Sequence, residues 1–415
     1  MNLEKMGKAA KEAAKKMAQA SSEQKNTALR AIIEVAKKRE KEILLENQKD
    51  IIKAKTLGLE EAMLERLSLQ NRLRTIFSDL EKIIDLPDPV SECFEEKSVG
   101  DLQIKKQRTP LGVLGVIYES RPNVTIDISA LAIKSGNCAI LRGGSESLHT
   151  NTILIEVIQE ALTLAKIPTH AIQMILDTDR SSIKKMLKLH KYIDLIIPRG
   201  GAALQKFCLD AGKIPVITGG VGICHIFVDK SANLEKSLRV ILNAKTQRPT
   251  VCNALDTLLI HEEISDIFTT KVIHLLSTQG VKFHLDAKGM QIAQGENNCL
   301  AALLHDWDTE WLGLHLGIKV VKNLEEAILH ITYHSTGHSD AILTENKENA
   351  DLFIAHIDSA AVYVNASTRF TDGGQLGLGA EVAISTQKLH ARGPMGLREL
   401  TSYKWVISGD YAIRN

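Results

Sequence analysis

The spacing of apolar residues alternates between two patterns along most of the chain. Apolar residues recur with helical spacing in 124–134 and 234–245, and they form short continuous runs in 111–118, 138–141 and 255–261. Short apolar runs bounded by turn residues are typical of strands that are buried on both faces. Because these strands take turns with helices, the pattern predicts parallel sheets covered by helices, the α/β class.

The same pattern divides the chain into regions. Residues 1–88 begin with an almost wholly helical block and are grouped with the first strand-and-helix series at 109–227, whereas a second series occupies 228–395. Residues 89–108 contain an alternating, strand-like stretch that predicts a projecting arm, and the tail at 396–415 contains another strand. We therefore expect two α/β domains and a small arm with a tail strand.

Composition narrows the class of protein without assigning a function. The 415 residues include 51 basic and 50 acidic side chains, and the net charge of +1 offers no general attraction for nucleic acid or for an anionic membrane. The six cysteines lie far apart, without the spacing of a disulfide framework or a zinc site. The cysteine spacing therefore predicts no structural metal. No apolar run reaches the roughly 18 residues of a membrane span, so a cytoplasmic protein is expected.

A cysteine stands in a polar break between a predicted helix and a predicted strand. Cys252 lies within Gln247–Ala254, four residues after Arg248. A thiolate is a strong nucleophile toward acyl carbons, and a nearby cation favours the thiolate over the thiol. The alternative is that Cys252 only fills space as a small buried apolar residue.

Three glycine-containing loops follow predicted strands, although the GxGxxG fingerprint of dinucleotide-binding proteins is absent. The loops contain Arg142 with Gly143, Arg199 with Gly200, and Gly219. Loops at the carboxyl ends of parallel strands bind ligands, and the helix amides that follow favour phosphate. The sequence therefore predicts a nucleotide, with simple turn formation as the alternative at each glycine.

Other polar residues have both a chemical and a structural interpretation. Asn123 is placed to donate to an oxyanion, but asparagine after proline more often forms an Asx turn or caps a helix. His338 and its neighbours His330 and His334 suggest cysteine–histidine catalysis or a metal site, with a hydrogen-bonded structural role as the alternative. Arg369 and Asp372 suit a zwitterionic amino-acid head, although surface ion pairs are commoner.

Four separate blocks resemble one known family. They are 116–125, 244–253, 338–342 and 364–374, and they contain Ser-Arg-Pro-Asn, Gln-Arg-Pro-Thr-Val-Cys-Asn, His-Ser-Asp and Arg-Phe-Thr-Asp-Gly-Gly. Over nearly its full length the chain resembles the aldehyde dehydrogenase superfamily, and within it the reductases that act on L-glutamyl 5-phosphate. The resemblance implies an aldehyde dehydrogenase-like fold, NADPH/NADP+ as the cofactor, and no metal.

The resemblance also assigns roles to residues. It implies that Cys252 is the nucleophile and that Asn123 belongs to the oxyanion hole. Arg142 stands in place of the lysine of a Lys-Pro-Ser-Glu motif and becomes a candidate for the 2′-phosphate of NADPH. The expected cofactor-binding residues are Arg142, Gly143, Ser145, Glu146, Arg199, Gly200, Gly219 and Glu310. The expected substrate-binding residues are Arg369, Asp372 and His338.

One departure from the superfamily bears on the reaction. Hydrolytic aldehyde dehydrogenases carry a water-activating glutamate where this chain has Ile217. The expected reaction is therefore NADPH-dependent reduction of L-glutamyl 5-phosphate to L-glutamate 5-semialdehyde in proline biosynthesis, through a Cys252 thioester and with release of phosphate. A hydrolytic NAD(P)-dependent aldehyde dehydrogenase and a nucleotide-binding protein without catalysis are the alternatives.

The resemblance further implies partners. A homo-oligomer is expected, in which the arm around 99–109 pairs with a tail strand from a second subunit. Contact with glutamate 5-kinase is expected because an acyl phosphate is unstable in water.

Overall fold

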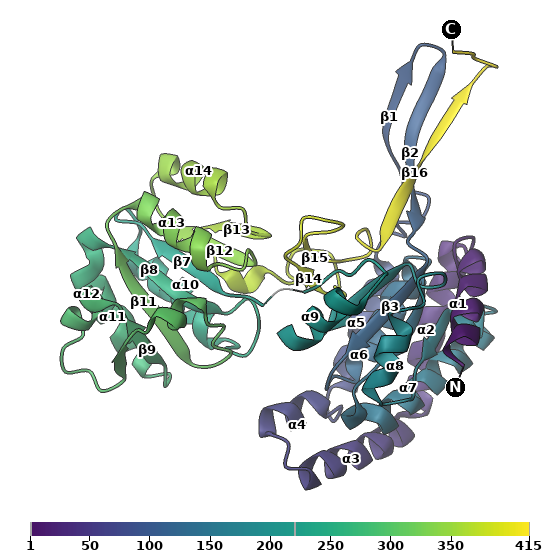
Figure 1. Ribbon diagram of the computed structural model, residues 1–415, viewed down its shortest axis with the longest axis horizontal. Helices are drawn as coiled ribbons and strands as arrows, with labels where there is room; N and C mark the ends of the chain where they lie inside the picture. The colour runs from purple at the N-terminus through teal and green to yellow at the C-terminus, as the bar shows by residue number, and fades with distance from the viewer. Residues whose placement is uncertain (1, 220, 415) are drawn as a thin grey trace. The chain divides into compact units, whose positions relative to one another are not determined.

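The computed structural model describes residues 2–219 and 221–414, which form two compact units (Figure 1). Unit 1 comprises Met1–Gly219, Gly377–Ala383 and Met395–Asn415, and unit 2 comprises Gly220–Leu376 and Ile384–Pro394. The predicted α/β class, with two parallel sheets covered by helices, is confirmed. In the described part of the chain, no helix is both long and apolar enough to cross a membrane.

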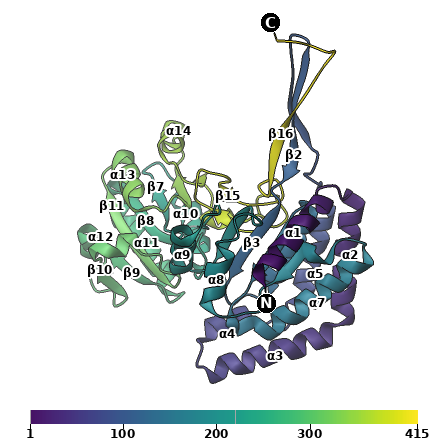
Figure 2. The ribbon, with the colours of Figure 1, turned by 45° about the vertical axis from the view of Figure 1, so that its right-hand side comes forward.

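Unit 1 begins with the helical block that the sequence predicts. Its helices are α1 (Leu3–Met17), α2 (Ser22–Lys38), α3 (Glu40–Thr56), α4 (Glu61–Leu67) and α5 (Leu73–Asp85). Ser21 forms a capping box at the start of α2, where its Oγ accepts from the Gln24 N–H at 3.2 Å and the Gln24 side chain accepts from the Ser21 N–H at 2.9 Å. Figure 2 shows α2 and α3 beside the later helix α7 (Leu148–Leu164).

The sheet of unit 1 is parallel and has the strand order β5-β4-β3-β6. Its strands are β3 (Val113–Tyr118), β4 (Cys138–Arg142), β5 (Ile172–Met174) and β6 (Leu195–Arg199). The connecting helices are α6 (Asn123–Lys134), α7, α8 (Arg180–Met186) and α9 (Ala202–Ala211). The chain reverses its direction of winding between β3 and β6, and open sheets bind ligands at such a switch point, outside the carboxyl ends of the strands.

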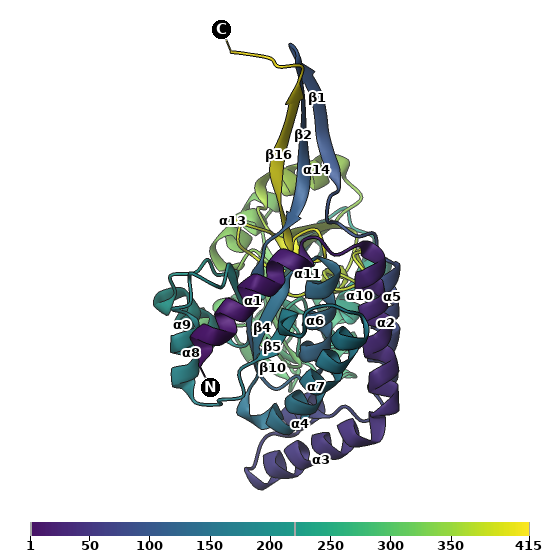
Figure 3. The same cartoon turned by 90° about the vertical axis from the view of Figure 1, so that its right-hand side faces the viewer.

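Three antiparallel strands form the arm, in the order β1-β2-β16 (Figure 3). They are β1 (Cys93–Val99), β2 (Leu102–Pro110) and β16 (Thr401–Gly409). The tail strand β16 pairs with β2 of the same chain, from Thr401 opposite Pro110 to Gly409 opposite Leu102. The resemblance predicts that the strand beside β2 comes from a second subunit. Because the tail strand of the same chain pairs with β2, that prediction is wrong. The reason is that Met395 and Leu400, just before β16, are buried in unit 1 and hold the tail beside β2.

Unit 2 contains a seven-stranded parallel sheet with the order β10-β9-β11-β8-β7-β12-β13. Its strands are β7 (Cys224–Val228), β8 (Leu255–His261), β9 (Lys282–Leu285), β10 (Cys299–Ala301), β11 (His315–Val321), β12 (Ser339–Leu343) and β13 (Ala361–Val364). Its helices are α10 (Leu234–Thr246), α11 (Ser265–Ser277), α12 (Ala287–Ile292), α13 (Leu324–His334) and α14 (Lys347–His356). The pair β14 (Ile384–Ser385) and β15 (Gly393–Pro394) completes the unit.

The division between the units differs in position from the predicted one. The sequence placed it between residues 227 and 228, whereas the units divide between 219 and 220. The cause is β7, which pairs with both β8 and β12 and so belongs wholly to the second sheet. Shortly before this division, Val216 forms only a single parallel bridge, with Ile196 of β6.

Candidate active site

Cys252 lies in the turn that connects α10 to β8, as the sequence predicts. Its side chain is half-buried, at the amino end of β8. All seven residues of β8 are buried, so the strand anchors one end of the turn in the core of unit 2. This placement makes the thiol accessible on a firmly held support, which a nucleophile requires.

The chain packs closely against the backbone of Cys252. A Cβ atom added to Gly222 would lie 1.7 Å from the Cys252 carbonyl oxygen, so only glycine fits at position 222. The buried Cys224 thiol donates to the same oxygen, with 3.2 Å between Sγ and O. Burial raises the pKa of Cys224 well above its usual range, which makes this thiol a hydrogen-bond donor rather than a second nucleophile. Neither Gly222 nor Cys224 is among the residues that the sequence predicts for the site.

Glu310 lies beside this glycine. Its Oε1 atom accepts from the Gly222 N–H at 2.9 Å, and burial raises the pKa of the carboxyl group. Gly222 therefore contacts Cys252 on one side and Glu310 on the other. The resemblance places Glu310 at the nicotinamide ribose. In the structure, Gly222 links this carboxyl group to the turn that contains Cys252.

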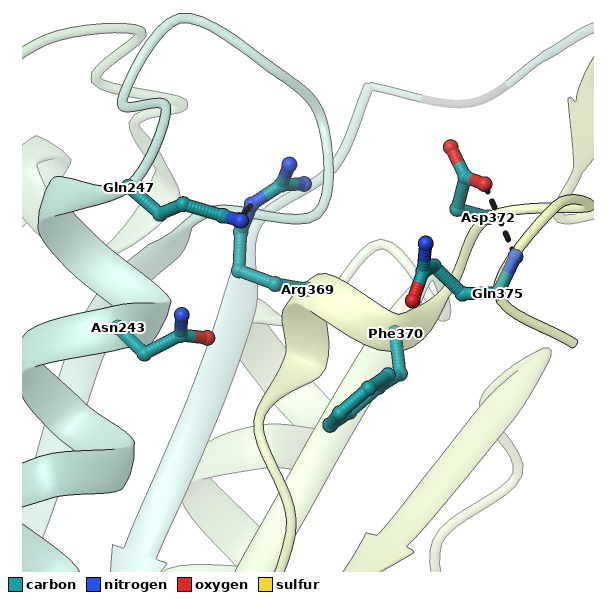
Figure 4. Close-up of a pocket in the computed structure, with 6 residues that line it drawn as sticks. All are labelled: Asn243, Gln247, Arg369, Phe370, Asp372 and Gln375. Atoms are coloured by element: carbon teal, nitrogen blue, oxygen red, sulfur yellow. Dashed lines mark hydrogen bonds between the residues drawn. The ribbon is translucent and has the colours of Figure 1, made fainter.

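A pocket of about 220 Å³ opens in unit 2 near this turn (Figure 4). It is lined by Asn243, Gln247, Arg369, Phe370, Asp372 and Gln375. The Arg369 side chain donates to Gln247 Oε1 at 3.0 Å and to Asn253 Oδ1, and burial lowers the pKa of its guanidinium. Asp372 Oδ1 accepts from the N–H groups of Gly374 and Gln375, at 2.9 and 3.2 Å. The predicted cation and anion thus line one pocket.

His338 does not line this pocket and lies beside Cys224, the thiol that donates to the Cys252 carbonyl oxygen. Its ring is fully buried, with Nδ1 2.8 Å from Ser339 Oγ and 3.9 Å from Cys224 Sγ. Burial lowers the pKa of His338 to about 4, so the ring is neutral near pH 7. Its burial supports a structural role, and the expected contact with substrate has no support in this position.

The other two histidines of the cluster are bound elsewhere in unit 2. His330 Nδ1 lies 3.2 Å from Lys319 Nζ, and burial lowers the pKa of His330 to about 2. His334 Nδ1 lies 2.7 Å from Asp308 Oδ1. Within residues 2–219 and 221–414, no group of three or more histidine, cysteine or acidic side chains has an arrangement that could hold a metal ion.

In unit 1, Asn123 is the first residue of α6 and follows the carboxyl end of β3. Pro122 occupies the capping position, so the alternative that Asn123 caps the helix is wrong. The Asn123 amide donates to Asp127 Oδ2 at 2.8 Å, which fixes the orientation of the side chain. Burial raises the pKa of Asp127 to about 6, and the carboxylate that accepts this bond is the main form at pH 7.

In the loop after β6, a glutamate side chain fills the space in which the glycines predict a phosphate. A Cβ added to Gly200 would lie 2.5 Å from Glu119 Oε2, and the Gly201 N–H donates to the same oxygen at 3.3 Å. The sequence predicts that the backbone amides at the start of α9 bind phosphate. Glu119 therefore already accepts the hydrogen bond of one of these amides, that of Gly201. Arg199 is half-buried at the end of β6, and Gly219 is half-buried at the end of the first described range.

A second pocket, of about 430 Å³, lies in unit 1 beside the ends of β3 and β4. It is lined by Lys53, Ala54, Leu57, Leu59, Met63, Glu119, Ser120, Ser145 and Glu146. Glu146 Oε1 accepts from the N–H and the hydroxyl of Ser120, at 2.6 and 2.8 Å. The pocket combines an apolar wall with hydroxyl and carboxylate groups, which suits the base and ribose of a nucleotide.

Arg142 and Gly143 end β4 and begin the loop that leads to Ser145, but they are not among the residues that line this pocket. Arg142 is only 7% exposed and donates to the Thr178 carbonyl oxygen at 2.7 Å, and burial lowers the pKa of its guanidinium. Its Nε atom is buried without a hydrogen-bond partner among the described residues. A Cβ on Gly143 would lie 2.3 Å from the Asn151 amide, so this glycine is required for packing.

Known proteins match the chain in sequence and in fold. The model of the aldehyde dehydrogenase family matches residues 1–293. The gamma-glutamyl phosphate reductases of Histophilus somni and Psychromonas ingrahamii are 51% and 52% identical to it, with 100% of each chain covered. The crystal structure of the gamma-glutamyl phosphate reductase of Thermotoga maritima has 47% identity, a TM-score of 0.96 and coverage of 99% of both chains.

A more distant structure shares the fold alone. An acetylating aldehyde dehydrogenase from Geobacillus thermoglucosidasius is 17% identical to the chain, with a TM-score of 0.72. It covers 99% of this chain, and 97% of its own chain is covered. The two-sheet architecture is therefore kept while most of the side chains differ.

Proposed function

The chain belongs to the aldehyde dehydrogenase family and is an oxidoreductase that reduces γ-glutamyl phosphate in proline biosynthesis; we propose that it does so with NADPH, through a thioester on Cys252. The observation that best supports the mechanism is the half-buried thiol at the amino end of β8, in a chain about half identical to reductases over their full length. The product is glutamate 5-semialdehyde.

The chemical steps assigned to the protein start at the thiol. The Cys252 thiolate attacks the acyl carbon, a C–S bond forms, and the C–O bond to phosphate breaks so that phosphate leaves with the electron pair. The Cys252 N–H and the Asn123 amide stabilise the oxyanion that develops during this exchange. The Asp127 contact holds the Asn123 amide in one orientation while leaving its second N–H available.

The residues of unit 1 fit a nucleotide. Ser145 and Glu146 line the pocket beside β4 and are proposed to bind a ribose, and the Arg142 guanidinium at the end of β4 is proposed to contact an anionic group. When bound, NADPH supplies the hydride that converts the thioester to the aldehyde. Gly143, Arg199, Gly200 and Gly219 are proposed to shape the loops around the cofactor, and Glu310 is proposed to bind the nicotinamide ribose.

The thioester has to survive until hydride transfer, and Ile217 supports this. Its side chain is only 2% exposed, and it stands where hydrolytic members of the superfamily carry the water-activating glutamate. An isoleucine has no group that takes a proton from water. The reductase is therefore favoured over the hydrolytic alternative, in which water would cleave the thioester.

Arg369 is expected to bind the carboxylate of the amino-acid head in the unit 2 pocket, beside Asp372 for the ammonium group. Arg369→Met should raise KM for glutamate 5-semialdehyde roughly 10- to 100-fold and change kcat less, because a hydrogen bond to a charged group contributes about 1.5–3 kcal/mol. Steady-state kinetics tests this. Arg392→Met is the matched control, since Arg392 binds Asp358 outside the pocket. An equal rise of KM in both variants would contradict the assignment.

Arg142 is expected to contribute to the preference for NADPH over NADH. Arg142→Met should raise KM for NADPH by roughly 10-fold with little change for NADH, because the 2′-phosphate loses a charge-assisted donor. The comparison variant is Lys53→Met, since Lys53 lines the pocket beside Ser145. If only Lys53→Met loses the preference, the 2′-phosphate binds at Lys53 and the assignment to Arg142 is wrong.

Three further parts of the proposal concern the setting of the enzyme. The protein is proposed to be a homo-oligomer, to contact glutamate 5-kinase, and to work in the cytoplasm. The instability of an acyl phosphate in water supports the contact with the kinase, because direct delivery limits loss of the substrate. Light scattering of the purified protein, alone and mixed with the kinase, tests the first two statements.

The function is tested most directly by running the reaction backwards. Purified protein is mixed with glutamate 5-semialdehyde and NADP+, and NADPH absorbance is followed with and without inorganic phosphate. Turnover that requires phosphate is expected, since phosphate must cleave the thioester to give γ-glutamyl phosphate. Turnover that is indifferent to phosphate would mean that water cleaves the thioester and that the protein is a hydrolytic dehydrogenase.

A further inference from the structure

A buried lysine closes the turn that contains Cys252. Lys245, in the last turn of α10, is completely buried, and its Nζ atom donates to the carbonyl oxygen of Leu255 at 2.8 Å. Leu255 is the first residue of β8, so this bond joins the two ends of the turn. The ten-residue separation between Lys245 and Leu255 spans the whole segment in which the thiol lies.

The same lysine forms a buried pair with Asp256. The distance between Lys245 Nζ and Asp256 Oδ1 is 3.7 Å, and the Asp256 side chain is 3% exposed. Burial lowers the pKa of Lys245 and raises that of Asp256, whereas the charge of each partner opposes these shifts. Cys224, Glu310 and His315 are further titratable groups that interact with this pair. Each member of the pair thus depends on the other for its charge in the core.

Asp256 also binds the loop that contains Glu310. Its Oδ1 atom accepts from the Trp311 N–H at 3.2 Å, and Glu310 in turn accepts from the N–H of Gly222, which lies against Cys252. The loop and the thiol-bearing turn are therefore joined at two points. One is the chain from Lys245 through Asp256 to Trp311, and the other is the Gly222 contact.

The indole ring of Trp311 gives the loop a third anchor. The ring stacks on His315 with centroids 5.2 Å apart and an angle of 14° between the planes, and it lies 4.1 Å from the ring of His284. His284 is itself held, with Nδ1 3.0 Å from Asp306 Oδ2. Because the ring of Trp311 is fixed, its backbone N–H is a firm donor to Asp256.

We propose that Lys245 and Asp256 are positioning residues that set the thiol of Cys252 and the carboxylate of Glu310 relative to each other. The pair holds the two ends of the thiol-bearing turn and ties this turn to the Trp311 backbone. A displacement of the Glu310 loop is therefore passed to Cys252 through hydrogen bonds rather than absorbed by the loop. The inference rests on the proposed function only for the roles of Cys252 and Glu310.

The test measures the thiol without turnover. The rate of alkylation of Cys252 by iodoacetamide is followed by mass spectrometry, with and without NADP+. Lys245→Met should alkylate about 10-fold more slowly than the wild type, because a displaced turn no longer holds the thiolate near the Arg369 guanidinium, with which Cys252 interacts electrostatically. Lys25→Met is the matched control, since Lys25 is equally buried and is paired with Asp88 in unit 1.

The link to Glu310 is read from the effect of NADP+ on alkylation. Saturating NADP+ should change the rate several-fold in the wild type and in Lys25→Met, and the effect should disappear in Lys245→Met and in Asp256→Leu. Asp256→Asn should keep much of the effect, because the amide oxygen still accepts from the Trp311 N–H. Circular dichroism checks that every variant is folded. A fall in melting temperature that occurs in both Lys245→Met and Lys25→Met reflects lost stability alone and does not bear on the positioning of the thiol.

The outcomes separate the inference from the proposed function. Equal alkylation rates in Lys245→Met and Lys25→Met, or an NADP+ effect that survives in Asp256→Leu, would overturn the inference even if γ-glutamyl phosphate is reduced normally. Slower alkylation in Lys245→Met alone would support it even if the wild type reduced no γ-glutamyl phosphate. In that second case, the proposed function fails and the positioning role of Lys245 stands.

Discussion

Replacement of Cys252 by alanine is expected to lower kcat by roughly 10⁴-fold or more, because covalent catalysis has no alternative nucleophile at this position. The neighbouring thiol of Cys224 cannot substitute for it, since it is fully buried and donates to the Cys252 carbonyl oxygen. The measurement is the rate of the phosphate-dependent reverse reaction, together with mass spectrometry of the protein after mixing with γ-glutamyl phosphate. The wild type should gain the mass of a glutamyl group, and the variant should not.

The control for this prediction is Cys299→Ala. Cys299 is also half-buried in unit 2, but it lies on the edge strand β10 and packs against the hydrophobic core. Its replacement should leave kcat within about a factor of two, because it changes only a small apolar contact. If Cys252→Ala kept most of the activity, or if Cys299→Ala lost as much, the thioester mechanism would be wrong.

The local pattern of the sequence predicts much of the fold. Strands buried on both faces appear as continuous apolar runs, and the run at 255–261 became β8 with all of its residues buried. The helix expected at 234–245 became α10, which extends one residue further. The polar break between them, and therefore the position of Cys252, follows directly from these two elements. Short-range periodicity determines such features, and it is visible in a single sequence.

Features that depend on contacts between distant segments were not predictable in this way. The tail strand was correctly expected, but its partner was not, since pairing with β2 depends on the burial of Met395 and Leu400. The glycine at 200 was expected beside phosphate, yet Glu119 from a different loop occupies the adjacent amide. Local sequence reports the conformation that a loop permits, and it does not report which side chain the fold brings against it.

The candidate site shows the same limit. Lys245 and Asp256 stand in ordinary helix and strand patterns, where a lysine is usually a solvated surface residue. Only the fold shows that Lys245 is completely buried and reaches Leu255. Gly222 is similar, since its role depends on the carbonyl oxygen of Cys252, 30 residues later. The sequence did contain one signal for this pair. Asp256 is the second residue of the predicted buried strand Leu255–His261, and a charged side chain there needs a partner in the core.

Asn123→Ala is expected to lower kcat by roughly 10²- to 10³-fold with little change in KM, because an oxyanion donor acts only as charge develops on the acyl oxygen. The structure supports this role over a structural one. Asn123 does not cap α6, and within the described residues its amide donates to a single partner, Asp127, which leaves one N–H for the substrate. Steady-state kinetics of the reverse reaction gives the two constants separately.

The control is Asn298→Ala, which removes an asparagine that only bonds the protein to itself. Its amide donates to Ser277 Oγ at 2.7 Å and to the Val281 carbonyl oxygen at 3.0 Å, so its loss should lower the melting temperature and leave kcat nearly unchanged. Asn123→Asp should behave like Asn123→Ala, since a carboxylate keeps the size of the side chain but cannot donate. A normal kcat in Asn123→Asp would contradict the oxyanion role, because shape alone would then be sufficient.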